Sequence, residues 1–177
     1  MIKKIIYRLI MNINGKYDAK KLIEKGMVCG KNFNLLNSYI DPGHCWLIKI
    51  GDNVTITNSV VLAHDASTKM YLNKSKIAKV IIGNNVFIGW GSIILPGSII
   101  GDNVIVGAGS VVTKNIPPNS VVAGNPAKII GKTNEYIEKN KKMMNKVPVY
   151  DKHWSKKSKG DINKIINEIG NAYAFDD

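Results

Sequence analysis

The most regular feature of the chain is an aliphatic residue that returns at every sixth position. The series comprises Ile50, Ile56, Leu62, Ile82, Ile88, Ile94, Ile100, Val106 and Val112. Ile, Leu and Val are 49 of the 177 residues, so nine in succession is roughly a one-in-100,000 coincidence. A period of six fits neither the 3.6-residue turn of a helix nor a simple alternating strand. It predicts a solenoid with three flat faces per coil, in which each unit is one short strand and one turn.

The polar positions of the repeat predict how the coils turn. Glycine often follows the aliphatic residue, and Asp-Asn or Asn-Asn pairs come next, at 52–53, 84–85 and 102–103. Glycine permits a tight backbone and Asn tolerates left-handed dihedral angles, so we expect these residues at the corners. The fifth positions are small or branched and are expected in the narrow interior: Val54, Val60, Ala66, Val86, Ser92, Ser98, Val104, Ser110 and Ile116.

The repeat is interrupted once and is flanked by helical patterns. Residues 67–79 carry no repeat, which predicts an extruded loop, and such breaks commonly carry function. Apolar residues between 2 and 13 have the spacing of an amphipathic helix, and residues 136–144 and 162–169 predict C-terminal helices. We therefore divide the chain into an N-terminal helical segment (1–25), a solenoid domain (26–132) and a C-terminal helical extension (133–177).

Composition narrows the class of protein. Two cysteines, Cys29 and Cys45, are too few for a disulfide framework and match no zinc spacing, so a reducing cytoplasm is expected. We expect neither a signal peptide nor a membrane span. The net charge of +12 is spread along the chain without a basic reading helix, which argues against nucleic acid. The positive charge is better explained by binding of anionic small molecules, or by weak contact with a membrane surface near Lys3, Lys4 and the 69–79 loop.

Several segments together resemble a known enzyme family. They are IGDNVTI (50–56), LAHDAS (62–67), VIIGNNVFIGWGSIILPG (80–97) and IIGDNVIVGAGSVVTKNIPPNSVVAGNPAKII (99–130). The chain resembles the hexapeptide-repeat acyltransferases, in particular the galactoside, maltose and polysaccharide O-acetyltransferases. The resemblance implies a mainly β fold, the left-handed parallel β-helix, acetyl-CoA as acyl donor, a small-molecule or carbohydrate acceptor, and a homotrimer with active sites between subunits.

One histidine is the candidate catalytic residue. His64 stands at the third position of its unit, where side chains point outward, directly before the interruption. In the family resembled, the residue at this place is the general base. A neutral imidazole can accept a hydroxyl proton at physiological pH, so His64 is expected to activate an acceptor hydroxyl for direct attack on the thioester.

The resemblance also implies residues that bind the two substrates. By position, acetyl-CoA is expected to contact Trp90, Gly107, Ala108, Thr113 and Lys114, with Lys128 near the nucleotide phosphates. Acceptor contacts are expected from Asn37, His44 and Asp65.

Other functions remain open at this point. A carbonic anhydrase with the same fold needs three zinc-binding histidines, two of them closely spaced. His44, His64 and His153 are separated by 20 and 89 residues, so no metal site is expected. A sugar N-acetyltransferase, an acetyltransferase for another hydroxyl acceptor such as an antibiotic or serine, and a noncatalytic β-helix scaffold remain alternatives.

Overall fold

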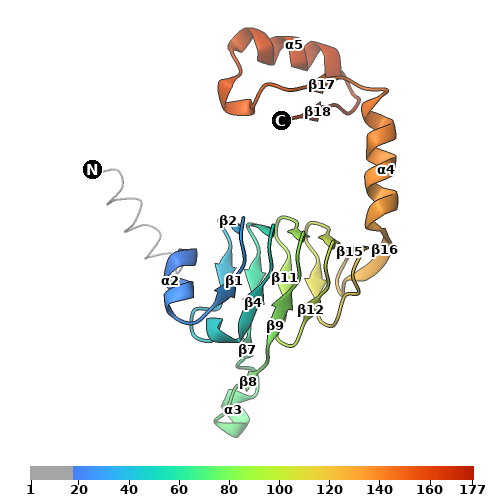
Figure 1. Ribbon diagram of the computed structural model, residues 1–177. Helices are drawn as coiled ribbons and strands as arrows, with labels where there is room; N and C mark the ends of the chain where they lie inside the picture. Colours follow the sequence, from blue (N-terminus) through green and yellow to red (C-terminus); the bar gives the residue numbers. More distant parts are fainter. Residues whose placement is uncertain (1–17) are drawn as a thin grey trace, which may run out of the picture. The chain divides into compact units, whose positions relative to one another are not determined.

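The computed structural model of the chain describes residues 18–177. The amphipathic helix predicted between residues 2 and 13 lies outside the described residues. Helix α2 (Ala19–Glu24) follows Asp18, whose carboxylate accepts a hydrogen bond from the backbone N–H of Lys20 and so caps the helix. The chain forms two compact units, of which the first ends at Thr133 and the second comprises Asn134–Asp177 (Figure 1).

Short parallel strands of the first unit stack into three sheets. The first sheet contains β1 (Val28–Cys29), β4 (Ile48–Ile50), β9 (Val80–Ile82) and β12 (Ile99–Ile100). The second contains β2 (Asn34–Leu36), β5 (Thr55–Thr57), β10 (Phe87–Ile88), β13 (Ile105–Val106) and β15 (Ser120–Ala123), with β16 (Lys128–Lys132) antiparallel to β15. The third contains β3 (Tyr39–Ile40), β6 (Val60–Val61), β11 (Ile93–Ile94) and β14 (Val111–Val112). Consecutive strands enter different sheets, so the chain winds as a three-sided coil (Figure 1).

The core of the coil is built from columns of aliphatic side chains. The parallel register aligns Ile50, Ile82 and Ile100 in the first sheet. In the second sheet it aligns Ile56, Ile88 and Val106 in the same way. Each of these side chains is at most 1% exposed. The predicted mainly β solenoid is therefore confirmed, because the residues of the six-residue repeat fill its axis.

The repeat slips by one residue in the second coil. Val61, rather than Leu62, pairs with Ile94 and is fully buried, while Leu62 is half-buried. Ser59 takes the interior corner position that the repeat assigns to Val60, because its hydroxyl accepts a hydrogen bond from the backbone of Ser92 at 3.1 Å. The preceding residue, Asn58, has a positive φ of 42°, which allows this shorter corner.

Two further expectations change with this slip. Ala66 is exposed instead of interior. His64 occupies the fourth position of the unit that begins at the buried Val61, not the third, and its side chain is one-third exposed.

Asparagine side chains stabilise one corner of the solenoid. Their side-chain amides form a ladder of hydrogen bonds of 2.9 to 3.0 Å between coils, and all have a φ of 54° to 58°: Asn32, Asn53, Asn85, Asn103 and Asn119. Glycine precedes this corner because the coils approach closely there. A Cβ on Gly83 would stand 2.8 Å from the carbonyl carbon of Gly101. The predicted roles of Asn and Gly at the corners are thus confirmed here.

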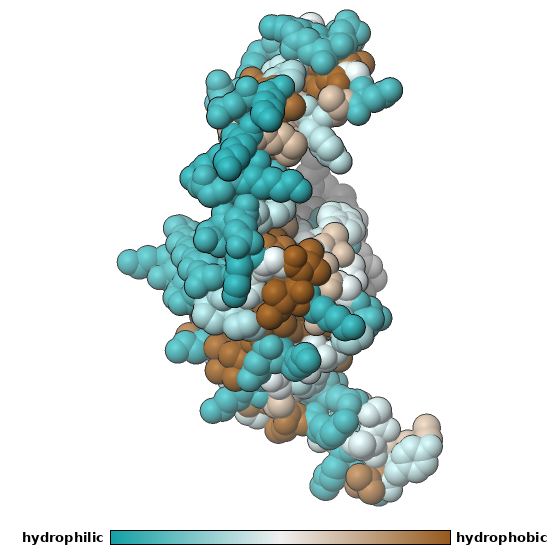
Figure 2. All heavy atoms as spheres, turned by 90° about the vertical axis from the view of Figure 1, so that its right-hand side faces the viewer, coloured by the Kyte–Doolittle hydropathy of each residue, from teal (hydrophilic) through white to brown (hydrophobic). Residues whose placement is uncertain are grey.

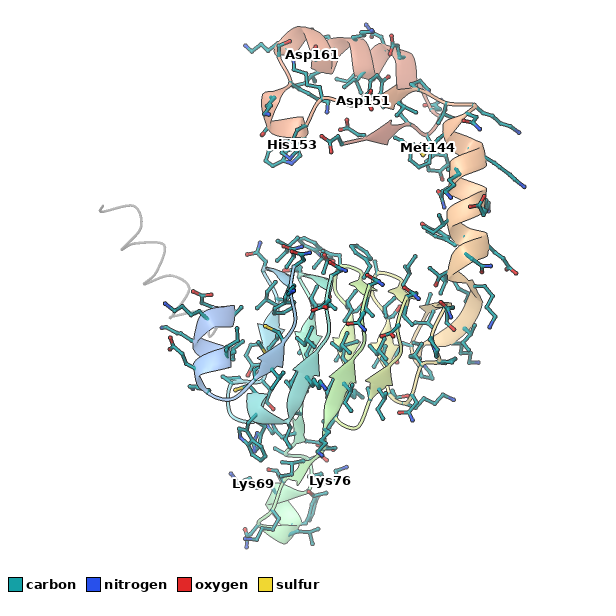
Figure 3. The ribbon with its side chains drawn as sticks, viewed as in Figure 1. Lys69, Lys76, Met144, Asp151, His153 and Asp161 are labelled. Atoms are coloured by element: carbon teal, nitrogen blue, oxygen red, sulfur yellow. The ribbon has the colours of Figure 1, made fainter. Side chains whose placement is uncertain are left out.

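The interruption forms an arm that projects from the coils (Figure 1). Strand β7 (His64–Asp65) pairs antiparallel with β8 (Lys76–Ile77), and the short helix α3 (Lys69–Leu72) lies between them. Met70 and Tyr71 are more than 80% exposed. Figure 2 shows hydrophobic and hydrophilic side chains together at the tip of this arm, and Figure 3 places Lys69 and Lys76 on it. The extruded loop is therefore confirmed.

The second unit contains the predicted C-terminal helices. Helix α4 (Thr133–Met144) leads into strand β17 (Val149–Tyr150), the 3-10 turn η2 (Trp154–Lys156), helix α5 (Lys159–Ile169) and strand β18 (Phe175–Asp176), which pairs with β17. Ser158 and Asp161, the latter labelled in Figure 3, form a capping box at the start of α5. Among the residues described, no helix combines the length and apolar character that crossing a bilayer requires.

Candidate active site

The candidate catalytic residues lie where the chain turns from the third sheet to the first. We call this edge the histidine corner; it comprises residues 41–47 in the first coil, 62–65 in the second, 95–98 in the third and 113–115 in the fourth. In the first coil the turn ends in the 3-10 turn η1 (Cys45–Leu47). Cys45 is fully buried and its thiol contacts the carbonyl oxygen of Leu22 in α2 at 3.6 Å. This contact anchors the turn against the end of the solenoid.

A buried aspartate orients the candidate base. Asp41 is 1% exposed, and its Oδ1 accepts hydrogen bonds from the backbone N–H groups of Gly43 at 3.0 Å and His44 at 3.2 Å. Its Oδ2 accepts from the backbone N–H of Ala63 at 3.3 Å and pairs with Nδ1 of His64. Burial raises the pKa of this carboxyl group, but the hydrogen bond and charge of His64 and the amide donors outweigh it, so the pKa lies below its ordinary value. Asp41 is thus held as a carboxylate.

The carboxylate determines which nitrogen of His64 is free. An ionised carboxyl group only accepts hydrogen bonds, so Nδ1 of His64 must carry the proton that it donates to Asp41. In the neutral ring Nε2 then keeps its lone pair. With one-third of the side chain exposed, His64 has the arrangement of a general base backed by a carboxylate.

A second histidine lies beside the first. The ring centroids of His44 and His64 are 4.7 Å apart, with 36° between the ring planes. Nδ1 of His44 stands 3.5 Å from Oδ2 of Asp41. The structure thus brings together two residues predicted separately, one as the base and one as an acceptor contact.

Asp41 and the two histidines lie close enough together to share a metal ion. The ligand atoms of Asp41, His44 and His64 lie within 4.8 Å of one another. Oδ2 of Asp41 and Nδ1 of His64 already share a hydrogen bond, which a cation bound through either atom would have to displace. The third histidine, His153, lies in the second unit, where its Nδ1 contacts the hydroxyl of Ser155 at 2.8 Å (Figure 3). The geometry is that of a hydrogen-bonded histidine and carboxylate.

Asp65, predicted as an acceptor contact, lies where the arm joins the solenoid and holds its two strands together. Its carboxylate accepts a hydrogen bond from the backbone N–H of Ser67 at 2.8 Å and pairs with Nζ of Lys76 at 2.7 Å. The hydrogen bond from Lys76, followed by that from Ser67, lowers the pKa of this carboxyl group far below its ordinary value. Because Asp65 lies directly after His64, the ion pair fixes the backbone that follows this histidine.

The predicted coenzyme contacts divide between two corners. Thr113 and Lys114 follow β14 and are exposed on the histidine corner. The β6, β11 and β14 strands that lead to this corner are adjacent rungs, so these residues lie two coils from His64, about 10 Å at the usual strand spacing.

The remaining coenzyme candidates line the opposite edge of the third sheet. We call this edge, where the chain turns from the second sheet to the third, the tryptophan corner. The carbonyl oxygen of Trp90, whose indole is 62% exposed, accepts a hydrogen bond from the backbone of Gly109 at 2.8 Å, which stacks Trp90 on the Gly107 to Gly109 turn. Gly107 lies close to Ala123, because a Cβ added to Gly107 would stand 3.2 Å from the Cβ of Ala123. Ala123 of β15 in turn pairs with Lys128 of β16.

Together the two corners account for every predicted site residue. The tryptophan corner carries Asn37, Trp90, Gly107, Ala108 and Lys128, with Asn37 exposed at its first-coil end. The histidine corner carries His44, His64, Asp65, Thr113 and Lys114. The two corners lie at opposite ends of the third sheet, before and after the short strand β11 (Ile93–Ile94) in the third coil.

Asp41 is the residue of this site that the sequence patterns did not single out. It follows the buried Ile40, at the position that is Leu62 in the second coil and Leu95 in the third. The sequence signal for Asp41 was a carboxylate at a position where the second and third coils have leucine. It was hidden because the repeat becomes irregular before Ile50.

Comparisons with known proteins concern the family and the fold. Residues 79–114 match the family described as bacterial transferase hexapeptide (six repeats). The chain is 54% identical over 99 residues to protein CapG of Staphylococcus aureus, covering 53% of this chain and 58% of that one. It is 45% identical over 139 residues to the putative acetyltransferase YJL218W of Saccharomyces cerevisiae, covering 72% of this chain and 71% of that protein.

A solved structure supports the fold over most of its length. A galactoside acetyltransferase in complex with coenzyme A superposes with a TM-score of 0.55 and 28% identity, covering 77% of this chain and 83% of that one. The likeness confirms the left-handed parallel β-helix. The matches span only about half to two thirds of the length of several curated relatives, 51% to 65%.

Proposed function

The chain belongs to the hexapeptide-repeat acyltransferase family, and on that premise we propose that it is an acetyl-CoA-dependent O-acetyltransferase that acts on a hydroxyl group of a sugar or surface-polysaccharide precursor. The observation that carries the proposal is the hydrogen-bonded pair of Asp41 and His64 at a partly exposed corner. The likeness to a galactoside acetyltransferase supports a sugar hydroxyl as the acceptor.

In the proposed reaction both substrates are bound at the same time. Nε2 of His64 takes the proton of the acceptor hydroxyl while its oxygen attacks the carbonyl carbon of the thioester. The new carbon–oxygen bond gives the acetyl ester, the carbon–sulfur bond breaks, and the imidazolium returns its proton to the departing thiolate of CoA. Asp41 stabilises the imidazolium through Nδ1. No nucleophile of the protein takes part.

The positions of the coenzyme candidates support a homotrimer with shared sites. Lys114 and Lys128 are exposed cations that suit the phosphates of CoA, and Gly107 with Ala108 offers a smooth wall for its pantetheine arm. Because this wall lies at the opposite edge of the third sheet from the histidine corner of the same chain, we propose that CoA held at one subunit's tryptophan corner meets His64 of the next subunit. Closed cyclic assembly repeats such an interface around the axis.

Mixed assemblies test the shared site. We expect His64→Ala chains and Ala108→Trp chains each to be inactive alone, since one lacks the base and the other fills the proposed CoA groove at an exposed position. Co-expressed at equal amounts, they should recover about a quarter of the wild-type activity per site, because one interface in four pairs an intact base with an intact groove. Mixtures without recovery would place both parts of the site in one chain.

A panel of acceptors tests the reaction class. We expect the thiol of CoA to be released from acetyl-CoA when a nucleotide sugar or oligosaccharide with free hydroxyl groups is present, and the product to lose its acetyl group in mild base, as an ester does. A base-stable product on a free amino sugar would indicate N-acetylation, and turnover with serine another acceptor class. No turnover with any acceptor, together with no binding of acetyl-CoA, would instead favour a noncatalytic scaffold.

A further inference from the structure

We propose that His44 binds a second hydroxyl group of the acceptor, next to the one that His64 deprotonates, so that the enzyme selects sugars with a free vicinal diol. The inference rests on the proposed function and adds the feature of the acceptor that the site recognises. It arises from the pairing of His44 with His64 across the carboxylate of Asp41.

His44 is held in a defined position. Its backbone N–H donates to Oδ1 of Asp41 at 3.2 Å, and its carbonyl oxygen accepts from the backbone of Leu47 at 2.9 Å, which closes η1. The next residue, Cys45, is fully buried. Both ends of the residue are therefore fixed to the same turn that carries Asp41.

The two rings present the same atom outward. Within residues 18–177, Nδ1 of His44 is the one buried side-chain nitrogen or oxygen without a hydrogen-bond partner. Nε2 of His44 and Nε2 of His64 likewise have no partner in the described part of the chain, so both are accessible to solvent. Each ring directs Nδ1 toward Asp41 and keeps Nε2 free.

The carboxylate gives both free nitrogens the same chemical role. Nδ1 of His44 faces Oδ2 of Asp41 at 3.5 Å with no other partner, and a negative oxygen there favours the tautomer with the proton on Nδ1. Nε2 of His44 is then a hydrogen-bond acceptor, like Nε2 of His64. One hydroxyl group has a single proton and can donate to only one of them. Two hydroxyl groups on adjacent carbon atoms satisfy both, at about 2.8 Å from each nitrogen.

An exposed aromatic residue beside His44 points to a sugar as the carrier of the diol. The ring of Trp46 lies 6.0 Å from that of His44 and its side chain is 54% exposed. An indole offers a large apolar face, on which the C–H face of a pyranose ring packs while its hydroxyl groups bind polar atoms nearby. His44 caps the 3-10 turn η1 and Trp46 lies within it, so a single sugar ring can contact both.

The test uses the methyl glycoside that the acceptor panel identifies and its single-deoxy derivatives. We expect the wild-type protein to have a 10- to 100-fold higher kcat/KM for the glycoside with the intact diol than for the derivative that lacks the hydroxyl next to the acetylated one. We expect His44→Phe to lower kcat/KM for the intact glycoside to the value of that derivative, mainly through KM, and to leave the derivative unchanged. His44→Gln, which keeps an acceptor atom, should recover part of the loss.

Controls separate recognition from folding. His153→Phe, in the second unit, should leave both acceptors unchanged, and His44→Phe should keep the wild-type KM for acetyl-CoA and the wild-type pH profile of kcat. Trp46→Leu should raise KM for both glycosides and keep their ratio. Equal losses with both glycosides in His44→Phe, or a wild-type protein that does not distinguish them, would overturn the proposal while leaving acetyl transfer itself established.

Discussion

Replacing His64 with glutamine is expected to lower kcat for acetyl transfer about 1,000-fold, because an amide cannot take the proton of the attacking hydroxyl group as the imidazole of His64 does in the proposed mechanism. Glutamine is uncharged, polar and of similar length to histidine, so the histidine corner should stay folded. The rate is measured as release of the CoA thiol under saturating acceptor. Binding of acetyl-CoA, measured by calorimetry, should change less than threefold, since His64 is not among the residues expected to bind the coenzyme.

A matched variant makes the result specific. His153→Gln removes a histidine of the second unit that contacts only its own turn, and its kcat should equal that of the wild-type protein. If His64→Gln kept more than a tenth of the wild-type kcat, the acceptor would have to lose its proton to solvent or to the thiolate, and the proposed mechanism would be wrong.

The Asp41→Asn variant should lower kcat by about 100- to 10,000-fold although Asp41 does not touch the substrates. An amide whose oxygen replaces Oδ1 keeps the hydrogen bonds from the backbone N–H groups of Gly43 and His44 but loses the one from Ala63, which donates to Oδ2. Its NH₂ group would then donate to Nδ1 of His64. That reverses the tautomer, places the proton on Nε2 and removes the lone pair that accepts the hydroxyl proton.

Stability measurements distinguish this effect from unfolding. Because its contacts lower the pKa of Asp41, the ionised carboxyl group stabilises the fold at neutral pH, and this contribution is lost as pH falls below its ordinary value of 3.8 toward the lower pKa of the folded state. Asp41→Asn should cost about 1 to 3 kcal/mol at pH 7, measured by urea unfolding, and should lose this acid dependence.

Asp52→Asn is the matched control for this variant. Asn84 occupies the equivalent corner position one coil further, and its Oδ1 accepts from the backbone of Asp52 much as Asp52 accepts from that of Lys31. The control should therefore fold and turn over like the wild-type protein. If Asp41→Asn kept the wild-type kcat and pH profile, Asp41 would have no role in positioning the base.

The sequence predicted the parts of the fold that follow from periodicity. Ile82, Ile88 and Ile94 repeat without interruption, and each lies on the axis of the coil. The slip at Val61 was not predictable, because Val61 and Leu62 are both aliphatic and either one continues the pattern. Only the hydrogen bonds of Ser59 to its neighbouring coils decide between them.

The candidate site was predictable only in part, for a different reason. His64 was predicted from its place beside the interruption, but its contact with Asp41 joins residues 23 positions apart across two coils. No local pattern records such a pairing. The division of the site residues between two corners was not predictable either, since the 67–79 interruption disrupts the six-residue period that assigns each residue to a face of the coil.

His64 is also the first residue of the projecting arm, and this gives the arm two parts with unlike freedom to change. The end of the arm next to the solenoid is constrained, because His64 pairs with Ile77 between the two strands and the Asp65–Lys76 ion pair holds the adjoining backbone. Its tip, from Ser67 to Lys74, touches little of the solenoid and is almost wholly exposed. Substitutions and insertions can accumulate at the tip without moving His64. The tip is therefore the place where related proteins can diverge in their partners while keeping one reaction.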